Sequence, residues 1–334
     1  MIGLPSDVRF DFWRSAGRDL VTARLKVLDA PLVPSGVHPF STQLLLSNNQ
    51  VFRGTVDAQG TPTTILRFTK SLFELLGSGP SGTPGWSWPG SRGLIEPEVG
   101  ADSILANVDI EFPALPAPEH NHERGFHGPN GKRGKLICLN VRIFNADNGL
   151  VLGTGSHAQG IVLGVRGAGR TKTSQGYFGH YGYVPQGAGV AIEDLDIQTI
   201  FHHDYSIQNT KGCVACRYKG VNFRHDFHAT SSDEEDDDNL FAFGNVGLGT
   251  RMFSEAGSAA NKPWTGDRTT FHDLRKGDGT LVPSSAFPSW VHQVIIPSSS
   301  LPPPPPPADP RITAKQKLLG LGLTSAEADV VVNP

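Results

Sequence analysis

The residue types best suited to acid–base chemistry gather in the second half of the chain. Ten of the twelve histidines lie between His120 and His272. Two short segments, His202-His203-Asp204 and Arg224-His225-Asp226-Phe227-His228, combine imidazole, carboxylate and guanidinium groups. Such groups donate or abstract protons, or stabilise charge that develops in a transition state. The candidate catalytic residues are His203, Asp204, His225, Asp226, His228 and Arg251.

The spacing of the two segments predicts that they lie on neighbouring turns of a repeating structure. His203 precedes His225, and Asp204 precedes Asp226, by the same interval of 22 residues. Equal intervals place each pair at one lateral position on adjacent strands, ~4.8 Å apart. We therefore expect these four side chains on one solvent-accessible wall that faces Arg251, where the closeness of the two aspartates would raise the pKa of one of them, as suits a general acid. Side chains on different faces would instead favour a structural or binding role.

Short strands with alternating apolar residues must position this cluster. The segments 104–112 and 139–143 alternate with period two, as half-buried strands do. Related strand motifs begin at Asn107, Asn140, Asp194 and Gly220, with one more strand at 160–165. The residues expected inside are Val108, Ile110, Val141, Ile143, Leu195, Ile197, Val221 and Phe223.

The irregular spacing of these motifs favours a β-solenoid. Their intervals are 33, 54 and 26 residues, as expected when loops of varying length leave a stack of strands. An antiparallel sandwich is the competing fold. It would need tight hairpin turns between adjacent strands, and Asp147-Asn148-Gly149 is the one good candidate.

Composition and sequence pattern disfavour several classes of function. The formal net charge is −3, which gives no basic footprint for nucleic acid. No run approaches the ~18 apolar residues of a membrane span. The first twenty residues lack the basic and apolar regions of a signal peptide.

The cysteines and the acidic residues are the candidate metal ligands of the chain. Cys138, Cys213 and Cys216 are too few for a disulfide framework, and a single Cys-x-x-Cys predicts buried thiols rather than a zinc site. The run Asp233–Asp238 is expected to be an exposed loop because its six carboxylates repel one another. Calcium is the one cofactor that such oxygen ligands suit, although the run lacks the glycines of calcium loops.

Changes in composition divide the chain into four parts. Residues 1–42 are expected to be irregular, with one helix near residues 13–27, and residues 43–297 to form the solenoid. Residues 298–310 form a linker with six consecutive prolines, a stiff polyproline II spacer. Residues 311–334 predict two short helices, the second opened by a capping box at Thr324 and Glu327.

Several motifs resemble one branch of the pectate-lyase-like superfamily. The segments 50–54 (Gln-Val-Phe-Arg-Gly) and 64–68 (Thr-Ile-Leu-Arg-Phe) are similar to its early turns. An ordered series follows, consisting of Phe201-His202-His203-Asp204, Asn222–His228, Asn239-Leu240-Phe241, Gly247-Leu248-Gly249-Thr250-Arg251 and Thr270-Phe271-His272. The series departs from the family where the acidic run precedes Asn239 and where His272 replaces an aromatic residue.

The resemblance covers roughly residues 43–275 and implies both a fold and a substrate class. The fold would be all-β, a right-handed single-stranded parallel β-helix with a short helical C-terminal tail. The expected partner is a polysaccharide or glycan, bound in a groove along the solenoid. Arg224, Trp264 and His272 are expected to bind it.

Two kinds of cleavage and one non-catalytic role remain open. A lyase needs a base and a cation or metal that neutralises a uronate, and a hydrolase needs two carboxyl groups. The residues offer both sets. The alternative is a non-catalytic glycan-binding or cell-surface β-helix, which the proline-rich linker would suit. Either function predicts a location outside the cell or on its surface.

Overall fold

The strands of the computed structural model stack into parallel sheets. The structure describes residues 8–77, 92–113, 125–164, 179–198, 201–220, 225–230, 239–246, 253–256, 269–287 and 291–295. Val221, Phe223, Arg224, Arg251, Trp264, the acidic run, the linker and the C-terminal tail lie outside these residues. Within them, no helix is long and apolar enough to cross a membrane.

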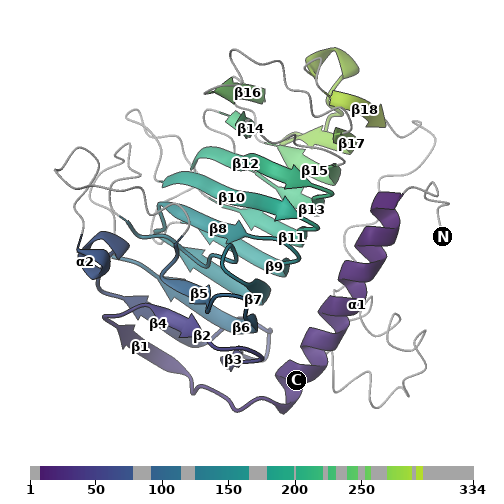
Figure 1. The fold of residues 1–334 in the computed structure, drawn as a ribbon. Helices are drawn as coiled ribbons and strands as arrows, with labels where there is room; N and C mark the ends of the chain where they lie inside the picture. The colour runs from purple at the N-terminus through teal and green to yellow at the C-terminus, as the bar shows by residue number, and fades with distance from the viewer. Residues whose placement is uncertain are drawn as a thin grey trace.

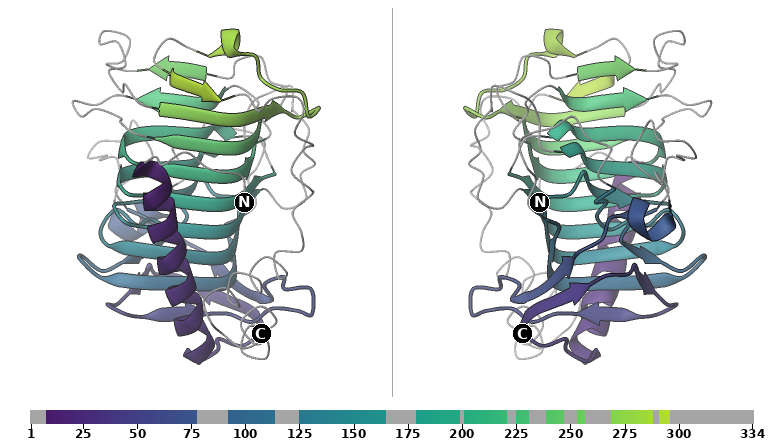
Figure 2. Two further views of the ribbon diagram at one scale, coloured as in Figure 1. Left: turned by 90° about the vertical axis from the view of Figure 1, so that its right-hand side faces the viewer. Right: turned by 90° about the vertical axis from the view of Figure 1, so that its left-hand side faces the viewer.

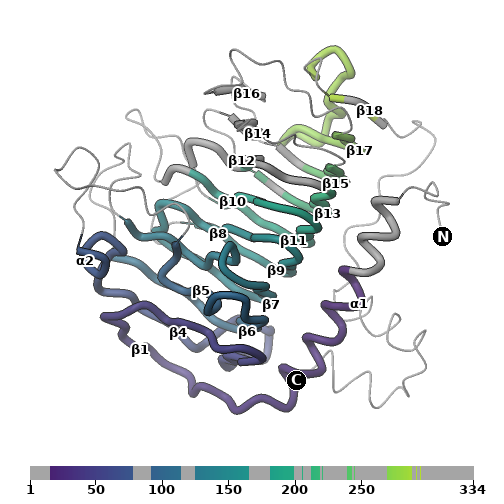
Figure 3. Tube along the Cα trace, viewed as in Figure 1, coloured from purple at the N-terminus to yellow at the C-terminus, as the bar shows by residue number. Residues whose placement is uncertain are grey.

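The chain winds between two sheets and adds one parallel strand to each in turn (Figure 1). From β7 to β17 the odd-numbered strands join a large sheet and the even-numbered strands a small sheet. The Cα trace follows the same winding from one end of the stack to the other (Figure 3). This alternation is the topology of a β-solenoid, and each complete turn of the chain is called a rung below. It excludes the antiparallel sandwich for the described residues.

The large sheet has eleven strands. They are β1 (Gly36–Phe40), β3 (Val51–Arg53), β4 (Thr64–Phe68), β6 (Asp102–Glu111), β7 (Lys135–Phe144), β9 (His157–Gly164), β11 (Ala191–Ile197), β13 (Val214–Lys219), β15 (Leu240–Val246), β17 (Thr269–Lys276) and β18 (Val291–Ile295).

The small sheet has five strands, and a two-stranded sheet adjoins it through single bridges. The small sheet contains β8 (Asn148–Leu152), β10 (Gly179–Ala188), β12 (Phe201–Lys211), β14 (His225–Thr230) and β16 (Phe253–Ala256). The two-stranded sheet pairs β2 (Leu44–Leu46) with β5 (Ile95–Pro97). The remaining elements are α1 (Val8–Asp29), α2 (Leu72–Leu76) and the 3-10 turn η2 (Ser284–Ala286).

A column of left-handed residues interrupts the strands of the large sheet. They are Asn107, Asn140, Gly160, Asp194, Arg217 and Asp273, with φ between 50° and 69°. Asparagine, aspartate and glycine tolerate this conformation better than other residues, so these types recur at one position of successive rungs. Their side chains also bond along the stack, because Asn140 Nδ2 donates to Asn107 Oδ1 at 3.0 Å.

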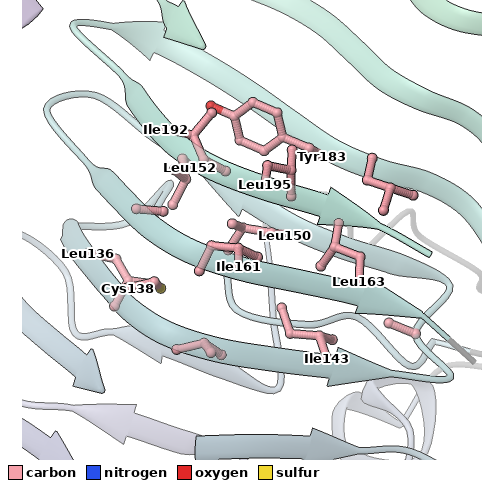
Figure 4. Packing of buried hydrophobic residues seen from close by; sticks show 14 of the residues in the cluster. Leu136, Cys138, Ile143, Leu150, Leu152, Ile161, Leu163, Tyr183, Ile192 and Leu195 are labelled. Atoms are coloured by element: carbon pink, nitrogen blue, oxygen red, sulfur yellow. The ribbon is translucent and has the colours of Figure 1, made fainter. Parts of the chain in front are cut away.

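The core lies between the sheets and is formed by the residues that alternate inward (Figure 4). Six residues expected inside are buried: Val108, Ile110, Val141, Ile143, Leu195 and Ile197. Residues 160–164 of the extra strand expected at residues 160–165 belong to β9, and residue 165 lies outside the described residues. The repeat expected at Gly220 is out of register, because Leu195 pairs with Tyr218 and not with Val221.

A row of aromatic rings fills the later rungs of the core. Tyr205 contacts Tyr218 edge-on at a centroid distance of 5.1 Å, and Tyr218 contacts Phe241 at 6.0 Å. Phe271 stacks on Phe241 at 5.1 Å. In the rung after Tyr218 the paired residue is Gly244, where a Cβ atom would lie 2.2 Å from the Tyr218 ring. The Tyr218 ring therefore occupies the space that a side chain at position 244 would need.

Helix α1 covers the outer face of the large sheet and crosses several rungs (Figure 2). Its buried residues recur at helical spacing and are Ala16, Leu20, Ala23 and Val27. They contact an apolar strip formed by Ile104, Ala106, Ile137, Leu139, Ala191, Val214, Cys216, Leu240 and Ala242. The helix expected near residues 13–27 thus exists and extends beyond both ends.

The part of residues 1–42 that the structure describes is regular rather than irregular. It contains α1 and also β1, which pairs with β4 in register from Gly36 to Phe40. The sheet therefore begins before residue 43, where the solenoid was expected to start. The period-two pattern of this strand is hidden because Pro39 interrupts it, and most of its residues are exposed or half-buried.

Polar contacts attach α1 to strands that lie far from it in the sequence. Asp19 Oδ2 accepts from Lys135 Nζ at 2.8 Å and lies 3.2 Å from Nε2 of His157. Further along the helix, Arg24 donates to Gln159 at 2.6 Å. His157 is 3% exposed, so its imidazole is buried beneath the helix.

The Tyr218–Gly244 contact predicts a costly glycine-to-alanine substitution. Gly244→Ala should lower the free energy of unfolding by about 1–3 kcal/mol, because the added methyl group overpacks the aromatic row. Urea unfolding would measure this, with Gly17→Ala in α1 as the control. That position has open space around it, so alanine should stabilise it by roughly 0.5–1 kcal/mol. If shortening Tyr218 to leucine did not reduce the penalty at Gly244, the assigned cause would be wrong.

The His157 site predicts that stability falls in mild acid. Burial, followed by the nearby Lys135 charge, holds the pKa of His157 below its ordinary value of 6.5. The unfolded chain therefore takes up a proton before the folded one does, and stability is lost as the pH falls below about 6.5. His157→Gln, which keeps an amide donor for Asp19, should flatten the dependence of the unfolding free energy between pH 7 and pH 5. His38→Gln, at a half-buried histidine on the strand β1, should leave the slope unchanged, and equal slopes for all three proteins would contradict the prediction.

Candidate functional site

The small sheet brings the two predicted segments side by side. Strands β12 and β14 pair in parallel, and His203 is directly opposite His225. The same register pairs Tyr205 with Phe227 and Ser206 with His228. Asp204 and Asp226 lie between the first two pairs, so they also occupy matching positions. The equal interval of 22 residues thus predicted the register of these strands correctly.

The expected single wall of four residues does not follow from this register. Successive residues of a strand belong to opposite faces of the sheet. Tyr205 is fully buried in the core, so position 203 lies on the core face and position 204 on the opposite one. The histidine pair and the aspartate pair are therefore on different faces. The interval alone carried no information about this, because it is the same for both pairs.

A polar column runs along the stack at the register of the histidines. His127 pairs with Asn148, Asn148 with Tyr181, and Tyr181 with His203. His127 is 2% exposed and Asn148 is 5% exposed. His203 and His225 continue this column, in which His127 and Asn148 are buried and Tyr181 is half-buried. This placement favours a structural role for the histidine pair.

The column at the register of the aspartates begins with glycines. Gly128, Gly149 and Gly182 occupy this position in the three preceding rungs. A Cβ atom on Gly128 would lie 1.9 Å from the carbonyl oxygen of Gly149, and one on Gly149 would lie 2.5 Å from that of Gly182. The column therefore has no side chains in these rungs. Asp204 and Asp226 follow these three glycines at the same register.

The other residues expected at the site are elsewhere or outside the described chain. His272 lies in β17 of the large sheet, opposite Ala242, and so is not in the same sheet as β12 and β14. Burial lowers the pKa of His272 below its ordinary value. His228 lies in β14, opposite Ser206. Arg224, Arg251 and Trp264 fall outside the described residues.

The sequence patterns did not predict a buried carboxylate on the adjoining two-stranded sheet. Glu96 is fully buried and contacts two guanidinium groups, those of Arg92 at 2.7 Å and Arg133 at 3.1 Å. The amide of Gly93 also donates to this carboxylate at 3.0 Å. Every oxygen of Glu96 thus has a donor, which stabilises the charge in a structural role. The spacing of Arg92 and Glu96 hinted at the first pair, but nothing predicted Arg133.

The three cysteines lie in the described part of the chain. Cys138, Cys213 and Cys216 are free and buried, and burial raises the pKa of Cys138 to about 12. In the part of the chain that the structure describes, no group of three His, Cys, Asp or Glu residues could hold a metal ion. The acidic run considered for calcium lies outside that part.

Comparison with known proteins yields matches to solved structures alone. No protein-family model matches the chain, and no curated protein does. The catalytic domain of GH87 alpha-1,3-glucanase in complex with nigerose is 10% identical over 73% of this chain and 53% of that chain, with a TM-score of 0.28. A pectin methylesterase variant in complex with hexasaccharide IV is 11% identical over 81% and 87%, with a TM-score of 0.35. The Azotobacter vinelandii mannuronan C-5 epimerase AlgE6 A-module is 10% identical over 90% and 96%, with a TM-score of 0.23.

The chain spans about half the length of the glucanase domain that it matches. All three TM-scores lie below 0.5, so we draw nothing about the function from these likenesses.

The register predicts which introduced thiols can be bridged. Cysteines at positions 204 and 226 (Asp204→Cys with Asp226→Cys) should be joined by a short bifunctional thiol reagent, because parallel neighbours lie ~4.8 Å apart on one face. The pair Asp204→Cys with His225→Cys is the control, since these positions lie on opposite faces. Peptide mass spectrometry after proteolysis would identify the bridge. A bridge in the control pair, or none in the first pair, would refute the assignment of faces.

Proposed function

We propose that this protein is a right-handed parallel β-helix that hydrolyses a polysaccharide, with Asp204 and Asp226 as its two catalytic carboxyl groups. The observation that carries the proposal is their matching position on β12 and β14, on the face opposite the buried Tyr205. Parallel neighbours are ~4.8 Å apart. Glycosidases that retain configuration hold their two carboxyl groups ~5–5.5 Å apart, which this spacing suits.

The two carboxyl groups would divide the chemical work. Two carboxylates on adjacent strands repel, so one of them retains a proton at a pH where an isolated aspartate is ionised. The protonated group donates its proton to the glycosidic oxygen as the bond from that oxygen to the sugar carbon breaks, and the ionised group bonds to this carbon. The first group then takes a proton from a water molecule, whose oxygen displaces the second carboxylate and releases the sugar.

Lyase chemistry is the less favoured form of cleavage. It would use the imidazole of His203 or His225 as the base that removes a proton from the sugar. These positions share the core face with Tyr205, and their column begins with buried His127 and Asn148. Cleavage of a polysaccharide would also place the protein outside the cell or on its surface.

The test is cleavage of neutral and uronate polysaccharides by single and double variants. Asp204→Asn and Asp226→Asn should each lower the rate of reducing-end release by about 10²–10⁴-fold, the usual worth of a general acid or base. The double variant should lose little more, because residues that act as a unit are not additive. Asp29→Asn, at an exposed carboxylate ending α1, is the matched control and should keep full activity.

Three outcomes would overturn the proposal in different ways. Unsaturated ends in place of reducing ends would identify a lyase. Full activity in both aspartate variants would move the site elsewhere. Binding of a polysaccharide without cleavage of any would favour the rival function, a non-catalytic glycan-binding or cell-surface β-helix.

A further inference from the structure

A small cavity lies between α1 and the first residues of β6 and β7, on the outer face of the large sheet. Its volume is about 180 Å³. Helix α1 contributes Thr22 and Lys26, and the opposite side contributes Asn49 and Asp102. The cavity is smaller than the ~300–1,000 Å³ of sites for drug-sized ligands, so it suits a single small molecule or one unit of a polymer.

The charges around the cavity cancel. Lys26 and Lys135 supply two positive charges, and Asp19 and Asp102 supply two negative charges. Asp19 and Lys135 are already paired at 2.8 Å. Lys26 and Asp102 are exposed and form no ion pair with the described residues. A cavity with no net charge gives no electrostatic advantage to an anion or a cation, so its ligand should be neutral.

The walls and the floor of the cavity differ in polarity. The side chains of Asp102 and Asn49 accept hydrogen bonds, and those of Lys26, Thr22 and Asn49 donate them. The floor contains Ala23, Ile104 and Ile137, which are buried against one another beneath α1. A ligand that fits has hydroxyl groups around its edge and an apolar C–H face. A pyranose ring has both.

We propose that this cavity binds one neutral sugar unit, at a site separate from the small sheet. The carboxylate of Asp102 accepts from a hydroxyl group of the sugar, and the ammonium group of Lys26 donates to another. The C–H face of the ring lies on Ile104 and Ile137. Such a site holds a glycan against the face of the solenoid that α1 covers, independently of any cleavage at Asp204 and Asp226.

The experiment follows the methyl resonances of the cavity floor in the full chain. Isoleucine methyl groups are ¹³C-labelled, and those of Ile104 and Ile137 are assigned through their Ile→Val variants. Methyl α-D-glucopyranoside, methyl β-D-galactopyranoside and methyl α-D-mannopyranoside are titrated as probes. At least one should shift both methyl resonances in a saturable way. Asp102→Asn and Lys26→Ala should each weaken that probe at least fivefold.

Two substitutions outside the cavity serve as matched controls. Glu98→Gln and Lys70→Ala remove an exposed carboxylate and an exposed ammonium group outside the cavity, and should leave the affinity unchanged. Saturable shifts with sodium sulfate or glycine but none with the glycosides would overturn the proposal, as would no shift with any probe. The Asp204→Asn and Asp226→Asn variants should bind the glycoside normally, so failure of the hydrolase proposal and failure of this one are distinguishable.

Discussion

The structure depends on the parallel pairing of each rung with the next. Every strand of the two main sheets is hydrogen-bonded to strands from neighbouring rungs, so each rung sets the lateral position of the one that follows. The column of left-handed residues reinforces this register through contacts along the stack, such as the bidentate bond from Arg217 to Asp194. A slip of one residue would bring inward side chains such as Val108 and Val141 to the outside, which the loss of apolar burial opposes.

Helix α1 adds long-range contacts to a fold whose other contacts join neighbouring rungs. Its apolar face seals the outer side of the large sheet across several rungs. The polar contacts of Asp19 and Arg24 determine where along the sheet it lies. Because these residues precede the solenoid in sequence, α1 ties the start of the chain to strands that follow much later. The same docking creates the small cavity at its side.

The candidate site illustrates how a stack of strands converts sequence spacing into geometry. Two residues separated by one rung become neighbours ~4.8 Å apart, whichever face they occupy. The face is decided by alternation relative to the core, and the buried Tyr205 shows which positions of β12 belong inside. Positions 204 and 226 therefore share one face of the small sheet, and positions 203 and 225 share the other.

The amino-acid sequence by itself determined the local properties of this protein. Period-two runs identified the inward residues from Val108 to Ile197, and equal spacing identified the pairing of His203 with His225. Such features depend on contacts within a strand or between adjacent rungs. Tertiary structure decided what depends on distant segments. The mismatched repeat at Gly220, the second arginine on Glu96 and the docking of α1 on the large sheet all arise from packing between residues far apart in the chain, which no local pattern encodes.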